Sequence, residues 1–311
     1  MSILVNSIFL IFLFAILGLA ADLAVRNIKY ITLSLKMNFF TMGVLLGIIT
    51  NLPELSVGIN AAVEGESSLS VGNILGGIIV VIALITGISV IFNREIKSDS
   101  DFKILIPIAL VIFSPFLLGL NGHYGILDGL ILIALYLGLL FYLYRSKRSF
   151  NRQIVLIERH KIIKALFLSI IGVILVMLSA HWIVGITLKL FEGTGVSNLV
   201  IGLLIFAIGT NLPELSIAFT SWKRKVSALS LSHLVSSAFT HVLVLGLLAV
   251  LRPIDFIVGP AYYSLFLFII LILILFVLFS RSNKSLERRE GFVLLFVYFA
   301  FIATNIFLIG H

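Results

Sequence analysis

The chain contains one seven-residue stretch twice, as Thr50-Asn51-Leu52-Pro53-Glu54-Leu55-Ser56 and again as Thr210-Asn211-Leu212-Pro213-Glu214-Leu215-Ser216. Each copy places a glutamate inside an apolar run that has no other charge, between Lys36 and Glu64 and between Glu192 and Lys223. A carboxylate near the centre of a bilayer is disfavoured by about 2.5–3.5 kcal/mol, so it marks an ion or substrate path by default. Proline removes a backbone donor and frees carbonyl oxygens beside the acid. Together with the Thr, Asn and Glu side chains, these carbonyls predict an oxygen-rich cage that suits Na⁺ or Ca²⁺.

The composition indicates a polytopic membrane protein. The 311 residues are 60% hydrophobic and 12% charged, and the mean hydropathy is +1.21. Cysteine is absent, which excludes disulfides, thiolate catalysis and cysteine-based zinc sites. HExxH, GxSxG, P-loop and dinucleotide-loop motifs are absent too, so we expect neither an enzyme nor a cofactor.

Runs of about 20 apolar residues predict an all-α integral membrane fold with ten transmembrane helices. Residues 1–20 resemble a signal peptide, because Gly18 to Ala21 look like a cleavage site. The stretch lacks the basic N-terminal region of a signal peptide, so we expect it to be the first transmembrane helix. The expected helices are 3–21, 38–62, 68–93, 103–120, 124–144, 162–188, 196–221, 228–250, 258–280 and 290–309.

The basic residues predict the orientation. With the N-terminus outside, all of the 22 Lys and Arg except Lys189 and Arg252 fall in inward loops. The positive-inside rule therefore predicts a multi-pass protein of the cell membrane with both termini extracytoplasmic. The distribution of the basic residues behind the net charge of +8 therefore reports the orientation in the membrane. We expect the partners to be the lipid bilayer and metal cations, without nucleic acid. The oligomeric state is left open, a monomer included.

An offset of 160 residues superimposes the two copies and carries Ser70 onto Ser230. Five helices in each half is an odd number, so the second half enters the membrane from the opposite side. The prediction is two inverted five-helix repeats, 1–150 and 160–311, with an ion site where they meet near the midplane. A proline in a membrane helix often marks only a kink, but packing alone does not require seven identical residues in both halves.

At this point the chain resembles the sodium/calcium exchanger family of the cation/calcium antiporters, whose two repeats carry a Gly-Thr-Ser-x-Pro-Glu type signature. The resemblance includes the two signature helices, Gly-Glu-Ser-Ser-Leu-Ser-Val-Gly-Asn at 65–73, Arg252-Pro253 and Arg288-Arg289-Glu290-Gly291. It implies ten helices, with the second, third, seventh and eighth around the site. It also implies exchange of Ca²⁺ for Na⁺ or H⁺ by alternating access.

The resemblance implies a set of cation ligands from both halves, with Glu54 and Glu214 as the charged metal ligands. Carbonyl oxygens near Gly47 and Ala207 would complete the shell. Ser237 matches a family serine on the eighth helix, whereas its counterpart on the third helix is Gly77. The implied side-chain ligands are Thr50, Asn51, Glu54, Thr210, Asn211, Glu214 and Ser237.

Several positions depart from the family pattern. Asn51 and Asn211 stand where sodium exchangers usually have serine, and proton-coupled exchangers also carry Asn there. Val81 and His241 stand where an amide or carboxylate is common. Glu54 and Glu214 supply a charge of −2, which balances one Ca²⁺ or two monovalent ions, but not three Na⁺. We therefore hypothesise that His241 makes the proton the coupling ion or makes transport depend on pH.

His233, Ser237 and His241 are spaced by four residues and share a face of the eighth helix. One reading of this face is a proton path, and another is an imidazole site that prefers a transition metal. A third reading is that the two histidines only make hydrogen bonds across the bundle. The corresponding residues of the third helix are Asn73, Gly77 and Val81, so the polar stripe occurs in one repeat only.

The leading interpretation is a secondary-active antiporter that exchanges a divalent cation, Ca²⁺ first, for Na⁺ or H⁺. The alternative is a non-exchanging cation channel or an ion-sensing membrane protein whose ion sites have degenerated. An intramembrane hydrolase is disfavoured, because the two glutamates are symmetry mates and no HExxH pair exists.

Overall fold

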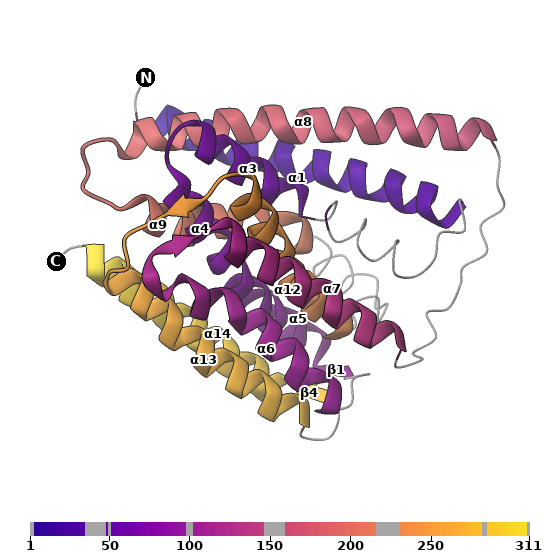
Figure 1. Cartoon of the computed structure of the whole chain (residues 1–311), viewed down its shortest axis with the longest axis vertical. Helices are drawn as coiled ribbons and strands as arrows, with labels where there is room; N and C mark the ends of the chain where they lie inside the picture. Colours follow the sequence, from indigo (N-terminus) through magenta and orange to yellow (C-terminus); the bar gives the residue numbers. More distant parts are fainter. Residues whose placement is uncertain are drawn as a thin grey trace.

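The computed structural model describes residues 3–34, 48, 51–97, 102–145, 159–215, 231–281 and 285–309. Most of these residues are helical, and helices from both halves of the chain share one large apolar core (Figure 1). Six of the described helical stretches are long and apolar enough to cross a membrane. The predicted all-α membrane fold is therefore confirmed. The count of ten stays a prediction, because parts of 38–62, 196–221 and 228–250 lie outside the described residues.

Two long helices, α1 (Ile3–Ser34) and α8 (Arg159–Phe191), lie side by side along one edge of the molecule (Figure 1). Their backbones approach closely at Gly172, where an added Cβ would lie 2.8 Å from the carbonyl oxygen of Ala20. The predicted end of the first helix at 21 is wrong. No Gly or Pro occurs between Asp22 and Ser34, and Asp22 pairs with Arg26 at 2.7 Å, so the helix continues past the apolar run.

The helices of the two motifs lie inside the bundle. In the first half α3 (Leu52–Val63) leads to a continuous helical rod that comprises α4 (Ser67–Ile79), the π-helix η1 (Val80–Ile85) and α5 (Thr86–Asn93). In the second half α9 (Asn198–Ile201), the π-helix η3 (Gly202–Phe206) and α10 (Ala207–Thr210) lead up to the motif, and α12 (Leu231–Leu251) is the counterpart of the rod. The remaining helices are α6 (Phe102–Leu118), the 3₁₀ turn η2 (Gly119–Asn121), α7 (Ile126–Arg145), α13 (Pro260–Arg281) and α14 (Arg288–Ile309).

Helices from opposite halves meet at glycines. A Cβ on Gly72 of α4 would lie 2.1 Å from the carbonyl oxygen of Leu199, and one on Gly202 would lie 2.4 Å from that of Leu69. Such distances leave no room for any side chain. The backbones of α4 and α9–η3 are therefore in direct contact.

Two short antiparallel strand pairs also join the halves. β1 (Glu95–Lys97) pairs with β4 (Ser285–Glu287), and β2 (His123–Tyr124) pairs with β3 (Ile254–Asp255). With the 160-residue offset, Glu95 of β1 corresponds to Asp255 of β3. β1 follows α5 of the first half and pairs with a strand of the second half, and β3 follows α12 of the second half and pairs with a strand of the first half. The two strand pairs are therefore related in the same way as the two halves.

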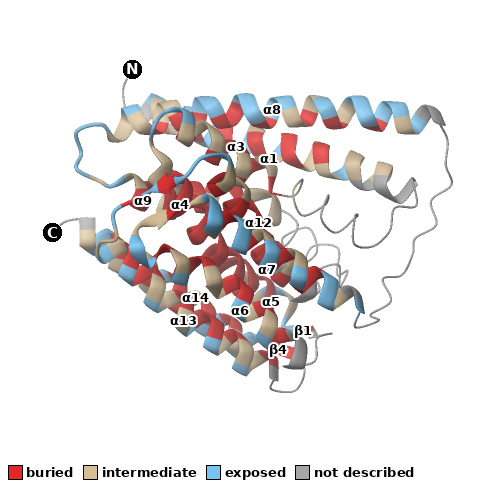
Figure 2. Ribbon diagram, viewed as in Figure 1, coloured by how far each residue is buried: buried red, intermediate tan, exposed pale blue. Residues whose placement is uncertain are grey.

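The surface of the outer helices is apolar. Figure 2 shows exposed positions along α8 and α13, with the buried positions concentrated on the inner elements. Many of the exposed side chains are large and hydrophobic, among them Leu127, Ile163, Leu267 and Phe296. Exposure of such a large apolar surface to water is unfavourable, whereas contact with the lipid tails of a membrane is not.

Candidate cation-binding site

The backbone leaves the helical conformation at the asparagine of each motif. Asn51 precedes α3 with φ −102° and ψ 23°, and Asn211 follows α10 with φ −90° and ψ 13°. After each asparagine a helical turn begins, in which the amide of Leu55 or Leu215 donates to the asparagine carbonyl. The prolines that follow have no amide hydrogen to donate. The second motif helix is therefore interrupted at Asn211, and Asn51 has similar backbone angles at the start of α3.

The motif side chains are buried within the bundle. Asn51, Glu54, Thr210 and Asn211 are at most 1% exposed, and Glu214 is partly buried. Glu54 and Glu214 occupy matching positions of the two motifs, one in each half of the chain. Gly47 and Thr50 lie outside the described residues.

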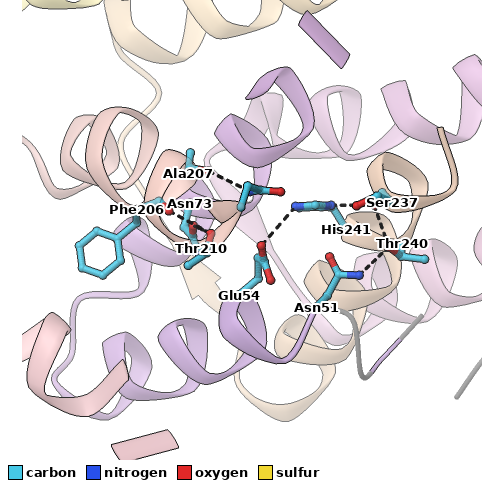
Figure 3. A network of polar contacts seen from close by, with 10 residues as sticks. Asn51, Glu54, Asn73, Phe206, Ala207, Thr210, Ser237, Thr240 and His241 are labelled. Carbon is cyan, nitrogen blue, oxygen red and sulfur yellow. Dashed lines mark hydrogen bonds and ion pairs between the residues drawn. The ribbon is translucent and has the colours of Figure 1, made fainter. Parts of the chain in front are cut away.

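Two acceptor oxygens lie beside the hydroxyl of Thr210. The hydroxyl lies 2.9 Å from the carbonyl oxygen of Phe206 and 3.1 Å from Oδ1 of Asn73 (Figure 3). One hydroxyl hydrogen serves only one of these acceptors at a time. Oε2 of Glu54 and Oδ1 of Asn211 are also buried without a hydrogen-bond partner among the described residues, as are Nδ2 of Asn73 and Oγ of Ser237. The described part of the site therefore holds buried acceptor oxygens that a cation can use, beside buried donors that have no described partner.

His241 contributes a nitrogen atom to the same space. Its Nδ1 lies 2.9 Å from the carbonyl oxygen of Ser237, and because a carbonyl only accepts, Nδ1 carries the hydrogen. In the neutral imidazole Nε2 is then an unprotonated acceptor. Nε2 lies 3.8 Å from Oε1 of Glu54, and both side chains are essentially fully buried (Figure 3).

Gly77 makes the room for this imidazole. A Cβ at residue 77 would lie 2.7 Å from Nε2 of His241 and 3.1 Å from Nδ2 of Asn211. The imidazole of His241 therefore occupies space that a side chain at residue 77 would need. Val81, the counterpart of His241, is fully buried in η1.

The two motif asparagines differ in their side-chain contacts. Asn51 donates to Oγ1 of Thr240 at 2.6 Å, and Thr240 donates to the Ser237 carbonyl at 2.7 Å (Figure 3). Asn211 instead donates to the carbonyl of Ala207 in its own helix, at 2.8 Å. The counterpart of Thr240 in the first half is Val80, which offers no hydroxyl, so Asn211 has no equivalent partner.

The comparison with known families gives a match over most of the chain. The family model described as sodium/calcium exchanger protein matches residues 6–145 and 164–307. The chain belongs to this family. Among its relatives, an uncharacterized membrane protein of Methanocaldococcus jannaschii is 28% identical over 86% of both chains. The sodium/calcium exchanger MaX1 of Methanosarcina acetivorans is 23% identical over 94% of this chain and 97% of its own length.

Solved structures share the exchanger fold. The sodium-calcium exchanger NCX_Mj has a TM-score of 0.66 at 22% identity, over 97% of this chain and 99% of its own. The H⁺/Ca²⁺ exchanger CAX has a TM-score of 0.74 at 17% identity, over 99% of this chain and 86% of its own. At these identities the likeness concerns the fold.

Within this exchanger fold, most of the predicted ligands lie in one region. Nε2 of His241 lies 3.8 Å from Oε1 of Glu54, and the carbonyl of Ser237 accepts from both His241 and Thr240. His233 lies in α12, but its side chain is outside the described residues. Asn73 and Thr240 were not predicted as site residues. The 160-residue comparison did not select them, because their counterparts are His233 and Val80.

Proposed function

We propose that this chain is a secondary-active antiporter that exchanges a divalent cation, Ca²⁺ first, for Na⁺ or H⁺ by alternating access. The observation that carries the proposal is the carboxylate of Glu54, which is 1% exposed and has an oxygen, Oε2, without a hydrogen-bond partner among the described residues; Glu214 is its counterpart in the other half. An ionised carboxylate inside a membrane protein requires positive charge beside it. The cation that supplies it is the transported substrate.

The same charge argument explains exchange. A total charge of −2 balances one divalent ion or two monovalent ions, so the two sets of ions compete for one site. Release of one set leaves the carboxylates uncompensated until the other set binds. Transport then uses an existing ion gradient and needs no nucleotide, cofactor or catalytic residue.

We propose that the cation ligands are the motif oxygens together with Ser237 and the carbonyls near Gly47 and Ala207. The Ala207 carbonyl already accepts from Asn211 but keeps a second lone pair. Asn73 joins this set because its oxygen lies against Thr210. His241, and His233 on the same helix, stay the proposed proton or coupling positions. The two repeats, 1–150 and 160–311, would each supply one half of the site.

We also propose that the protein lies in the cell membrane with both termini extracytoplasmic. The contacts between loops support two distinct ends of the molecule. Arg252 binds the carbonyl of Ala62, and Asn198 binds Glu66, so residues predicted outside contact one another. The pairing of β1 with β4 joins two segments that are both predicted inside.

Ion flux in proteoliposomes tests the function. We expect Ca²⁺ uptake to be driven by an outward Na⁺ gradient or an outward H⁺ gradient, and the effective gradient identifies the coupling ion. Protein-free vesicles are the control. Uptake that follows the Ca²⁺ gradient alone and ignores both counter-ions would indicate a channel and contradict antiport.

A further inference from the structure

We propose that this site binds a transition metal ion, for which Zn²⁺ is the probe, more tightly than it binds Ca²⁺, and that Nε2 of His241 and Oε1 of Glu54 are two of the ligands of that ion. The inference rests on the proposed function, because it names the class of ion that the antiporter carries. It concerns the one nitrogen ligand in a site otherwise made of oxygen.

The first argument is the tautomer of His241. The Ser237 carbonyl fixes the hydrogen on Nδ1, so Nε2 presents its lone pair to the site. A metal-binding histidine characteristically has its second nitrogen held in this way by a carbonyl or carboxylate. The contact to Ser237 therefore orients the imidazole for coordination through Nε2.

The second argument is what Nε2 faces. Within the described residues it has no hydrogen-bond donor, and a Glu54 oxygen lies 3.8 Å away. Two electron-rich atoms held together in a buried space are stabilised by a positive ion between them. A Zn–N bond of about 2.0–2.1 Å and a Zn–O bond of about 2.0–2.2 Å together exceed that separation, so one ion can contact both atoms.

The third argument is the space given to the imidazole. Gly77 has no side chain at the point where a Cβ would lie 2.7 Å from Nε2. A histidine that served only to fill the core would not need its reactive nitrogen directed toward a carboxylate. The glycine therefore leaves room for the imidazole next to α4.

The remaining ligands would be neutral oxygens and water. Among the described residues no three His, Cys, Asp or Glu side chains come together as a metal-binding group. Oδ1 of Asn211 is buried without a described hydrogen-bond partner, and the amide of Asn211 lies beside Gly77. Glu214, the counterpart of Glu54 in the second half, would supply the second negative charge. A mixed nitrogen and oxygen shell favours Zn²⁺ over Ca²⁺, because Ca²⁺ prefers oxygen alone.

Thermal unfolding of the purified protein with single metals tests the proposal. A bound ion raises the unfolding temperature according to its occupancy. We expect Zn²⁺ to protect the wild type at a lower concentration than Ca²⁺ does. In His241→Asn, and in His241→Gln as a second variant, the ratio of the Zn²⁺ midpoint to the Ca²⁺ midpoint should rise about ten-fold or more. The matched control is His181→Asn, since His181 is exposed on α8, where its Nδ1 lies 3.2 Å from Oδ1 of Asn60.

Co²⁺ provides a second measurement that does not depend on transport. Its visible absorption should appear on binding to the wild type and to the His181 variant, and should change or vanish in the His241 variants. Ca²⁺ protection without stronger Zn²⁺ protection, or a Zn²⁺ midpoint that is unchanged in both His241 variants, would overturn this inference and leave the antiporter in place. Failure of every divalent cation to protect, together with absent flux, would overturn both.

Discussion

At the level of single residues, the site depends on a fit between Gly77 and His241. The imidazole occupies the volume that a side chain at residue 77 would fill, with Nε2 only 2.7 Å from the position of its Cβ. A side chain at residue 77 therefore requires the imidazole of His241 to move.

This fit predicts a coupled pair of substitutions. Gly77→Ala should destabilise the protein, because the new methyl group pushes the imidazole off its place between Ser237 and Glu54. Adding His241→Asn should recover part of that loss, since the shorter side chain vacates the space. The coupling free energy should fall within about 0.5–3 kcal/mol, as measured by unfolding of both single variants and the double variant. Strictly additive effects would show that the two residues do not share this volume.

The sequence predicted the motif residues of the site more completely than their partners. The repeated stretch identified Glu54, Thr210 and Asn211, and the structure places all three in the buried interior. Asn73 and Thr240 were missed because the residue type differs between the halves, with His233 and Val80 as their counterparts. A comparison of the halves finds what they share, whereas these two contacts arise from the side chains of the opposite half.

At the level of the elements, glycine contacts hold the site helices together. Gly72 and Gly202 let the backbones of α4 and η3 touch, and both residues are buried. This contact sets how near α4 lies to the helix that carries Thr210. Helix spacing of this kind is invisible in the hydropathy pattern, which also gave the wrong end for α1. Helical hydrogen bonding continues beyond an apolar run when no Gly or Pro interrupts it.

The contact predicts an effect that depends on position. Gly202→Ala should destabilise the protein by about 1–3 kcal/mol, because its Cβ would lie 2.4 Å from the Leu69 carbonyl oxygen. Gly185→Ala in α8 is the matched control, since nothing lies within 4 Å of its Cβ. Alanine also favours a helix, so the control should unfold at an equal or higher temperature. Equal losses in both variants would contradict the close contact.

At the level of the whole molecule, two strand pairs join the halves, because β1 and β2 of the first half pair with β4 and β3 of the second half. Glu95 follows the rod formed by α4, η1 and α5, and its counterpart Asp255 follows α12. In inverted repeats, corresponding residues lie on opposite sides of the membrane. The basic loops predict that Glu95 is inside and Asp255 outside.

Single cysteines can test this inversion without background, because the chain has no cysteine of its own. Asp255→Cys should react with a membrane-impermeant thiol reagent in intact cells, and so should the exposed Glu64→Cys. Glu95→Cys should react only after the membrane is permeabilised. Labelling of Glu95→Cys and Asp255→Cys from the same side would mean that the halves are parallel.

The central claim is that Glu54 and Glu214 together hold the transported cation. The most direct measurement is counter-ion-driven Ca²⁺ flux in proteoliposomes containing Glu54→Gln or Glu214→Gln, with the exposed Glu64→Gln as the matched control. Each site variant leaves one negative charge for a divalent ion, so we predict flux at the level of protein-free vesicles in both and near wild-type flux in the control. Undiminished exchange in both site variants would place the transported ion elsewhere and contradict this account.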